Sequence, residues 1–215
     1  MQHGRYTAGT ATRYQQSLLT GPSTHQHLAQ GLMIGTRFHS TPVTRLGDGK
    51  LMQLGETLSA DGRWRLIVFA GLNDRAEPPS PASPTSQIYK LCSYLSESPQ
   101  SPLKRYTPAG ADVDAIFDVR AVFQQSHHDL AIATLPELLF PPKGRYGLRD
   151  YEKVFCALDG ANHKGENQNI YTLRGIDKEQ GCLVLVRPDQ YIAHILPLGD
   201  TEALAAFFAG FMLDA

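Results

Sequence analysis

The sequence predicts an α/β protein, a mixed β-sheet flanked by helices and preceded by an irregular N-terminal extension. Three observations predict this fold class. The run from Trp64 to Gly71 is apolar at nearly every position, further β-rich runs follow it, and the segment after Asp200 is amphipathic with a helical period. With 42% hydrophobic and 19% charged residues among 215, the composition is that of an ordinary globular chain. We expect a wrapping segment at 1–45 and one domain at 46–215.

The first 45 residues are rich in Gly, Thr, Ser, Gln and His and contain few apolar anchors. The one helical signal among them is short. Thr24 is a suitable N-cap for a helix containing Leu28, Leu32 and Met33. We therefore expect this segment to be irregular and to lie over a core that later residues form.

Regular structure is expected to begin after the Gly47-Asp48-Gly49 turn. Leu51 to Leu54 reads as a short strand, and the Asp61-Gly62 break suggests that it pairs as a hairpin with Trp64 to Gly71. The second arm has the continuous apolar character of a central strand that is buried on both faces of a sheet.

A proline-rich loop, 76–85, precedes a predicted helix. Ser83 is the expected N-cap with Pro84 at the first helical position, and prolines 99 and 102 are expected to end the helix. Its apolar face carries Ile88, Leu91, Cys92 and Leu95. Val113 to Phe123 is β-rich and predicts a second central strand.

The C-terminal half predicts further strands and a last helix. Leu130 to Pro142 reads as part helix and part loop, and Val154 to Leu158 as a third strand. Cys182 to Val186 and Tyr191 to Leu196 form a predicted antiparallel hairpin around a type I turn. Asp200 can cap the last helix, whose apolar face consists of Leu204, Phe207, Phe208 and Phe211. This order of elements is thioredoxin-like.

Several kinds of chemistry are not supported by the sequence. Neither G-x-G-x-x-G nor a P-loop occurs, and G-x-S-x-G and H-E-x-x-H are also missing. The residues that follow the first central strand are Ala70-Gly71-Leu72-Asn73-Asp74, where a thioredoxin would carry its redox cysteines. No proline lies between 142 and 188 to serve as the cis-proline. We therefore expect no dithiol oxidoreductase, no bound cofactor and no flavin site.

The net charge and the cysteine positions indicate which binding partners and which cellular compartment to expect. Twenty basic and 21 acidic residues favour neither nucleic acid nor an anionic membrane as a partner. Three scattered cysteines, at 92, 156 and 182, are expected in the core rather than in a disulfide or a zinc site. No apolar run approaches the roughly 20 residues of a membrane span, and no signal peptide is apparent, so we expect a cytoplasmic protein.

The ends of the predicted strands collect the candidate catalytic residues. In open α/β sheets ligands bind outside the carboxyl ends of the strands. That rule groups Asn73 and Asp74 with Asp129 and Asp159, and with His127, His128 and His163. Such a cluster could relay protons or bind a metal, but no metal-ligand spacing links its members, so solvated loop polarity is the simpler interpretation. We predict no metal site.

A second group of residues is a candidate interface or pocket. Arg187, Asp189, Gln190 and Tyr191 lie in or beside the predicted turn and could contact a partner, although turn formation explains them equally well. In a regular strand His194 would share a face with Ile192 and Leu196, which favours a core histidine. The phenylalanines at 207, 208 and 211 are expected to be mostly core, with part of their face available to a dimer or a small molecule.

At the C-terminal end the sequence resembles a known family. GIDKEQGCLVLVRPDQYIAHILPLGDTEALAAFFAGFM (175–212) resembles the C-terminal end of flavin-dependent phenol 2-monooxygenases and related aromatic hydroxylases, and VRPDQY is its most specific part. YQQSLLT, HLAQGLMIGTRFHSTPVTR and DGRWRLIVFAG are similar to the same region in the same order. The resemblance implies a thioredoxin-like domain that contributes dimer contacts and carries no catalytic residues. The family's FAD-binding and substrate domains are not represented, so it does not imply hydroxylase activity for this chain alone.

Two functions follow as hypotheses. The first is a non-redox thioredoxin-like module that dimerises or docks onto a flavoprotein monooxygenase. The second is a small cofactor-independent enzyme, an isomerase, cyclase or hydrolase, that acts on a phenolic or polyketide-like compound. In the second case a histidine at 127, 128 or 163 should lie within hydrogen-bond reach of an apolar pocket.

Overall fold

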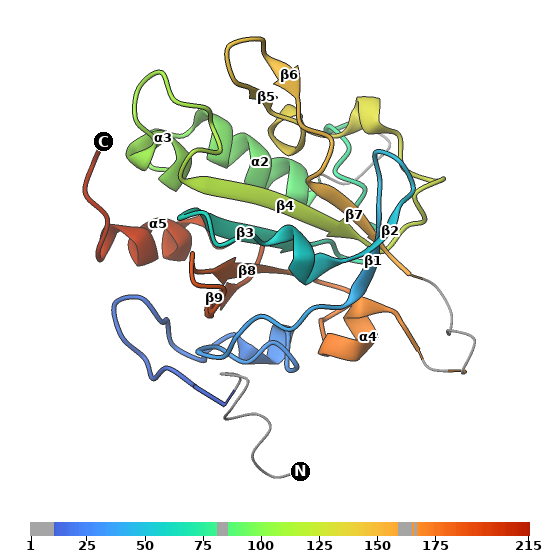
Figure 1. Ribbon diagram of the computed structural model, residues 1–215, viewed down its shortest axis with the longest axis horizontal. Coiled ribbons are helices and arrows are strands. Elements are labelled where there is room, and N and C mark those ends of the chain that lie inside the picture. Colours follow the sequence, from blue (N-terminus) through green and yellow to red (C-terminus); the bar gives the residue numbers. More distant parts are fainter. Residues whose placement is uncertain (1–10, 81–85, 159–164, 166) are drawn as a thin grey trace.

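A computed structural model describes residues 11–80, 86–158, 165 and 167–215. Its centre is a seven-stranded mixed sheet in the order β2-β1-β7-β4-β3-β8-β9 (Figure 1). The strands are β1 (Pro42–Arg45), β2 (Leu51–Gln53), β3 (Trp64–Phe69), β4 (Phe117–Phe123), β7 (Val154–Ala157), β8 (Cys182–Val186) and β9 (Ile192–Leu196), with a separate hairpin of β5 (Pro142–Lys143) and β6 (Leu148–Arg149). The helices are α2 (Gln87–Glu97), α3 (Pro102–Tyr106), α4 (Ile170–Arg174) and α5 (Thr201–Ala209), with 3₁₀ turns η1 (Gln26–Leu28), η2 (Leu54–Thr57), η3 (Ile132–Thr134) and η4 (Glu137–Leu139).

The central part of the sheet has thioredoxin-like topology, as predicted. Strands β3 and β4 are parallel and are joined through α2 and α3, whereas β8 runs antiparallel to β3 and forms a hairpin with β9. Helix α5 follows this hairpin. Every residue of β3, β4, β8 and β9 is buried, which explains their nearly continuous apolar sequences.

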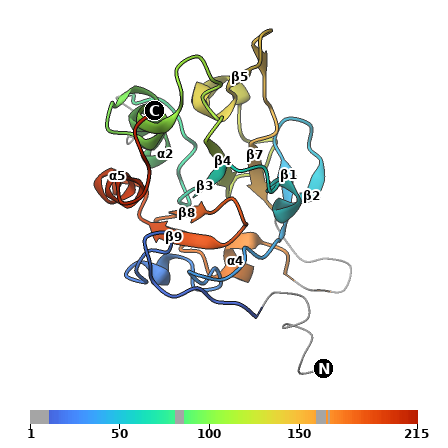
Figure 2. The same cartoon turned by 60° about the vertical axis from the view of Figure 1, so that its left-hand side comes forward.

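Two apolar cores cover the two faces of the sheet. Figure 2 shows α2 and α5 on one side of the sheet and α4 on the other. On one face the buried side chains of α2, α3 and α5 pack against β3 and β4. On the other face the N-terminal segment, which we define as residues 11–41, packs together with α4. Among the described residues no helix has both the length and the apolar character needed to cross a bilayer.

The N-terminal segment also pairs with the outer edge of β9. Gly35 and Phe38 donate backbone hydrogen bonds to the carbonyls of Ile192 and Gln190, each at 2.8 Å, and Ile192 donates to Thr36 at 2.9 Å. An edge strand with free backbone groups is a template for association with another chain. Because the N-terminal segment bonds to these backbone groups, the outer edge of β9 is not open to such association.

The predicted early hairpin is wrong. β2 pairs antiparallel with β1, and β3 is flanked by β4 and β8 instead. β1 carries no sequence signal, because only two of its four residues, Pro42 and Val43, are apolar and it therefore lacks a strand-length apolar run. β1 bonds to β7 and thereby places the β1–β2 hairpin at one end of the sheet.

Several element boundaries also differ from the prediction. The predicted cap Ser83 lies outside the described residues, and the N-cap of α2 is Ser86, whose Oγ accepts the N–H of Tyr89. The predicted apolar face of α2 is buried as expected. Pro102 begins α3 instead of only ending α2, β4 starts at Phe117, and the early helical signal forms only η1. Helix α4 is an element that no sequence pattern predicted.

Candidate functional site

The corner after β3, where a redox motif would lie in a thioredoxin, is occupied by Asp74. Its carboxylate accepts backbone hydrogen bonds from Gln87 at 2.9 Å, Ile88 at 3.1 Å and Ala76 at 2.9 Å, and a further one from the Ser86 hydroxyl. The first N–H groups of a helix have no partner within it and attract an anion. Asp74 therefore serves as the internal anion of α2, and its oxygens are used in holding the helix.

A cavity of about 500 Å³ lies at the same corner. Two of the strand-end residues, Asn73 and Asp74, line it, together with residues just before β8 and just after β9 that no sequence signal singled out. Gly181, at φ 66°, brings the first of these segments so close to β3 that a Cβ atom would lie 2.1 Å from the carbonyl oxygen of Phe69. The lining consists of Leu28, Gly71, Asn73, Asp74, Arg75, Glu77, Ser86, Gln87, Glu179, Gln180, Gly181, Pro197, Leu198 and Gly199.

The candidate histidines do not reach this cavity. His127 and His128 stack on each other with ring centroids 3.9 Å apart, and neither lines the cavity. The loops after β3 and β4 do meet, because Gln125 Nε2 donates to the Leu72 carbonyl at 2.7 Å. His163 and Asp159 lie outside the described residues. Within the parts of the chain that the structure describes, no three His, Cys, Asp or Glu side chains are gathered for a metal ion.

The three cysteines are buried and free, as the sequence analysis predicted. Burial raises the pKa of Cys92 to about 12 and that of Cys156 to about 12, and it also raises the pKa of Cys182. A thiol reacts as its thiolate, so these side chains are poor nucleophiles in the folded protein.

The turn between β8 and β9 holds the N-terminal segment. The Arg187 guanidinium lies 4.6 Å from the ring centroid of Tyr14 and pairs with Asp189 at 2.6 Å. Tyr14 in turn contacts Tyr191 edge to face, with centroids 4.8 Å apart. Arg37 donates to Gln190 Oε1 at 2.7 Å. The most specific part of the sequence pattern thus makes contacts within the chain, and a contact with a partner at these residues stays a prediction.

The aromatic side chains of the last helix also pack mostly inward. Phe208 is buried, with its ring centroid 5.1 Å from Trp64 and 4.8 Å from Phe117, whereas Phe207 and Phe211 are only half-buried. The ring centroid of Phe207 lies 6.1 Å from that of Trp64 and 5.4 Å from that of His194.

His194 is a core residue, but its predicted face is wrong. Ile192 and Leu196 pack in the two different cores, because the hairpin register shifts between Leu185 and Val186. A bulge of this kind changes which side chains share a face. Burial, followed by the nearby His25, lowers the pKa of His194 to about 4.

A buried ionic cluster is the main polar feature that the sequence analysis missed. Asp118 is fully buried, and its carboxylate pairs with Lys153, Arg120 and Arg65. The carboxylate lies 2.8 Å from Arg120 Nε and 3.0 Å from Arg65 Nε, but the Arg65 contact lacks the alignment of a hydrogen bond. Lys153 also pairs with buried Asp114 at 2.6 Å. Burial disfavours ionisation of Asp118, but the adjacent cations outweigh it and hold its pKa below the ordinary value. Charged residues inside otherwise apolar strands are the sequence signal that could have revealed this cluster.

Comparisons with known proteins match the chain to one family over almost its whole length. Residues 12–215 match the family described as phenol hydroxylase, C-terminal dimerisation domain. A 3-hydroxybenzoate 4-monooxygenase of Comamonas testosteroni is 54% identical over 211 residues, which are 98% of this chain and 32% of that protein. An FAD-dependent monooxygenase of Aspergillus terreus is 32% identical over 208 residues, 96% of this chain and 32% of that protein. The chain thus spans about a third of the length of these relatives.

Among solved structures, a thiol peroxidase from Chromobacterium violaceum has a TM-score of 0.39 at 13% identity and covers 80% of each chain. The family match extends over nearly the whole chain and includes the VRPDQY turn that carried the resemblance. The chain therefore belongs to the family of phenol hydroxylase C-terminal dimerisation domains.

Proposed function

We propose that this chain is a non-redox thioredoxin-like module that joins two copies to each other or docks onto a flavoprotein monooxygenase. The family match over residues 12–215, whose description names dimerisation, is the observation that carries the proposal. Its relatives are monooxygenases about three times as long, so we assign hydroxylation to the parts of such proteins that this chain does not span.

The corner after β3 supports a role without redox chemistry. A thioredoxin-type reaction needs an accessible low-pKa thiol near a helix N-terminus. Here Asp74 already occupies the N-terminal donors of α2, and the three cysteines are buried with raised pKa values. We accordingly propose that the ancestral site now has a structural role.

Self-association is tested by co-expressing a tagged and an untagged copy of the 215-residue chain. Purification through the tag should retain the untagged copy in a comparable amount, and a strict absence of the untagged copy would contradict dimerisation. Docking is tested separately by co-purification with a flavoprotein monooxygenase. A chain that neither self-associates nor binds such a partner would overturn the proposal.

The alternative function, a cofactor-independent enzyme acting on a phenolic or polyketide-like compound, has less support. It required a histidine at 127, 128 or 163 beside an apolar pocket. His127 and His128 line neither the cavity at the corner nor the hollow beside the β5–β6 hairpin, and His163 lies outside the described residues. We also propose a cytoplasmic location, which suits three free, buried thiols. A nearly neutral net charge gives no reason to propose nucleic acid as a partner.

A further inference from the structure

The cavity at the corner after β3 has the size and the apolar surface of a small-molecule site. Its volume of about 500 Å³ lies within the roughly 300–1,000 Å³ that is usual for ligand pockets. Apolar atoms form the larger part of its surface. Leu28, Pro197 and Leu198 contribute apolar side chains, and of these Leu28 and Leu198 are themselves buried. The cavity therefore offers an apolar surface for the body of a ligand.

The walls of this cavity are held in place by hydrogen bonds. Asp177 donates its N–H to the Leu28 carbonyl at 2.9 Å, which joins the N-terminal segment to the turn before β8. The Asp177 carboxylate accepts the N–H groups of Glu179 at 2.9 Å and Gln180 at 3.0 Å, and Asp74 holds the start of α2. A site whose walls are already ordered loses little conformational freedom when a ligand binds.

The charges that line the cavity favour a cation. Asp74, Glu77 and Glu179 contribute carboxylates, whereas the guanidinium comes from Arg75, which also donates to the Asp129 carbonyl at 3.5 Å. The N–H groups at the start of α2 would attract an anion, but the Asp74 carboxylate already accepts them. In the part of the chain that the structure describes, the exposed carboxylates of Glu77 and Glu179 form no ion pair. A cleft lined mainly by one sign of charge attracts ligands of the opposite sign.

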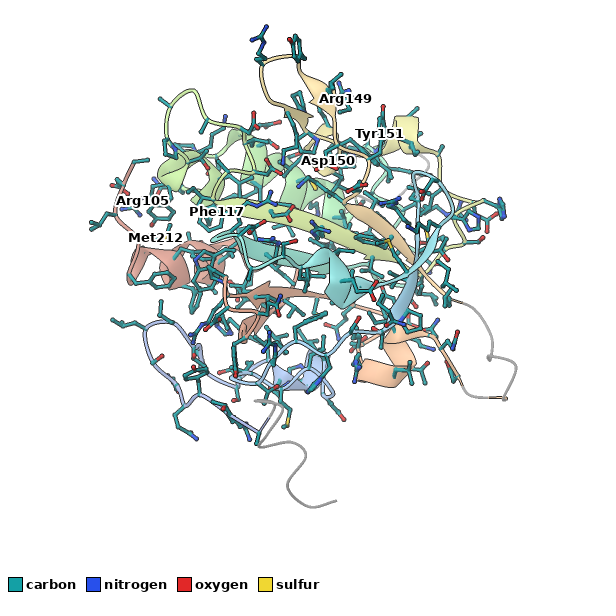
Figure 3. The ribbon with its side chains drawn as sticks, viewed as in Figure 1. Arg105, Phe117, Arg149, Asp150, Tyr151 and Met212 are labelled. Atoms are coloured by element: carbon teal, nitrogen blue, oxygen red, sulfur yellow. The ribbon has the colours of Figure 1, made fainter. Side chains whose placement is uncertain are left out.

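The hollow beside the β5–β6 hairpin lacks this combination of features. Figure 3 labels Arg149 and Tyr151, two of its lining residues, close to that hairpin. The hollow is smaller, about 270 Å³, and its surface is more polar than apolar. The Glu137 carboxylate that lines it already pairs with Arg149 at 2.8 Å. Of these two cavities, the one at the corner is therefore the better ligand site.

We infer that the corner cavity binds a small organic cation, a protonated amine attached to an apolar body. The ammonium group pairs with Glu77 or Glu179, and the apolar body lies on Leu28, Pro197 and Leu198. Hydrogen bonds to ionised groups are roughly twice as strong as those between neutral groups, so the free carboxylates select the charge of the ligand. This inference is independent of the proposed dimerisation or docking, and either can fail without the other.

The first test is a titration of the isotope-labelled chain with benzylamine, followed through its amide resonances by two-dimensional NMR. The resonances of Gly71, Gly181 and Gly199, which line the cavity, should shift and saturate with a dissociation constant of about 1 mM. Benzyl alcohol has nearly the same shape without the charge, and methylamine has the charge without the apolar body, so each should bind about tenfold more weakly or less. The inference is wrong if either binds as tightly as benzylamine, or if the cavity resonances do not shift.

Two matched double variants test which carboxylates hold the ammonium group. Glu77→Gln with Glu179→Gln should weaken benzylamine binding about tenfold or more, because both free carboxylates of the cavity are lost. The control, Glu56→Gln with Glu97→Gln, removes the same charge from two exposed glutamates outside the cavity and should leave the affinity unchanged. The same spectra show that each variant is folded. Equal affinities for the two double variants would overturn the inference, because the amine would then respond only to the net charge of the chain.

Discussion

The buried ionic cluster yields a prediction whose direction follows from charge counting. Arg65, Arg120 and Lys153 contribute three buried cations, and Asp114 and Asp118 contribute two buried anions. Asp118→Asn keeps the shape of the side chain but removes the carboxylate that Arg65, Arg120 and Lys153 share. Arg120 loses the carboxylate with which it pairs in the described structure. Removing one partner of a buried ion pair costs about 3–5 kcal/mol.

Lys153→Met should cost less, although Lys153 contacts both carboxylates. Asp118 would keep Arg120 and Arg65, and Asp114 would keep Lys143 at 2.9 Å and Arg63 at 3.2 Å. We expect about 1–2 kcal/mol for this change. As a surface control, Glu152→Gln removes an exposed partner of Arg45 and should cost about 0–1 kcal/mol.

Urea unfolding followed by circular dichroism measures these differences. With a slope of about 2 kcal/mol per molar urea, Asp118→Asn should lower the midpoint by about 1.5–2.5 M. The result that would refute the reasoning is a midpoint for Asp118→Asn within about 0.5 M of the wild type, or above that of Lys153→Met.

The same cluster predicts a dependence of stability on pH. Burial disfavours the charged carboxylates of Asp114 and Asp118, but the adjacent cations outweigh it and hold both pKa values below the ordinary value. The unfolded chain therefore takes up protons at a higher pH than the folded one. The stabilisation is complete above the unfolded value of about 4 and is lost as the pH falls below it. Asp118→Asn should make this acidic limb shallower.

Three further predictions concern the rest of the chain. Burial lowers the pKa of His194 to about 4, so the free energy of unfolding should fall by up to about 1.4 kcal/mol per pH unit as the pH drops from 6.5 to 4. His194→Gln should flatten this slope, which urea midpoints measured at several pH values would show. Arg187→Ala removes the contact with Tyr14 and should speed amide hydrogen exchange at Gly35 and Ile192, whereas unchanged exchange would contradict the role of the turn. A thiol reagent should label the three cysteines rapidly only after unfolding, and fast labelling of the native protein would contradict their burial.

The sequence predicted best those elements that carry a long apolar signal. β3, α2, β8, β9 and α5 each have an apolar run or face, and the structure confirms them. β1 and β2 are short and only partly apolar, so their pairing depends on contacts that no local pattern encodes. The prediction that β2 pairs with β3 was wrong for this reason, because it assumed that strands adjacent in the sequence are also adjacent in the sheet.

The candidate site was predicted less well, for a related reason. The strand-end rule groups Asn73 and Asp74 at one corner, but it cannot show that the Asp74 carboxylate accepts the first N–H groups of α2, because that role requires the distance between two segments. Likewise Arg65, Asp118 and Lys153 lie far apart in sequence, and only the pairing of β3, β4 and β7 brings them together. The charges of Arg65 and Asp118 inside apolar strands are visible in the sequence, but their partners are not.

The most direct test of the account is the molar mass of the 215-residue chain in solution, measured by light scattering across a range of micromolar concentrations. The account predicts a mass near twice the 23.7 kDa of one chain, approached as the concentration rises. A mass that stays at 23.7 kDa at every concentration would contradict it.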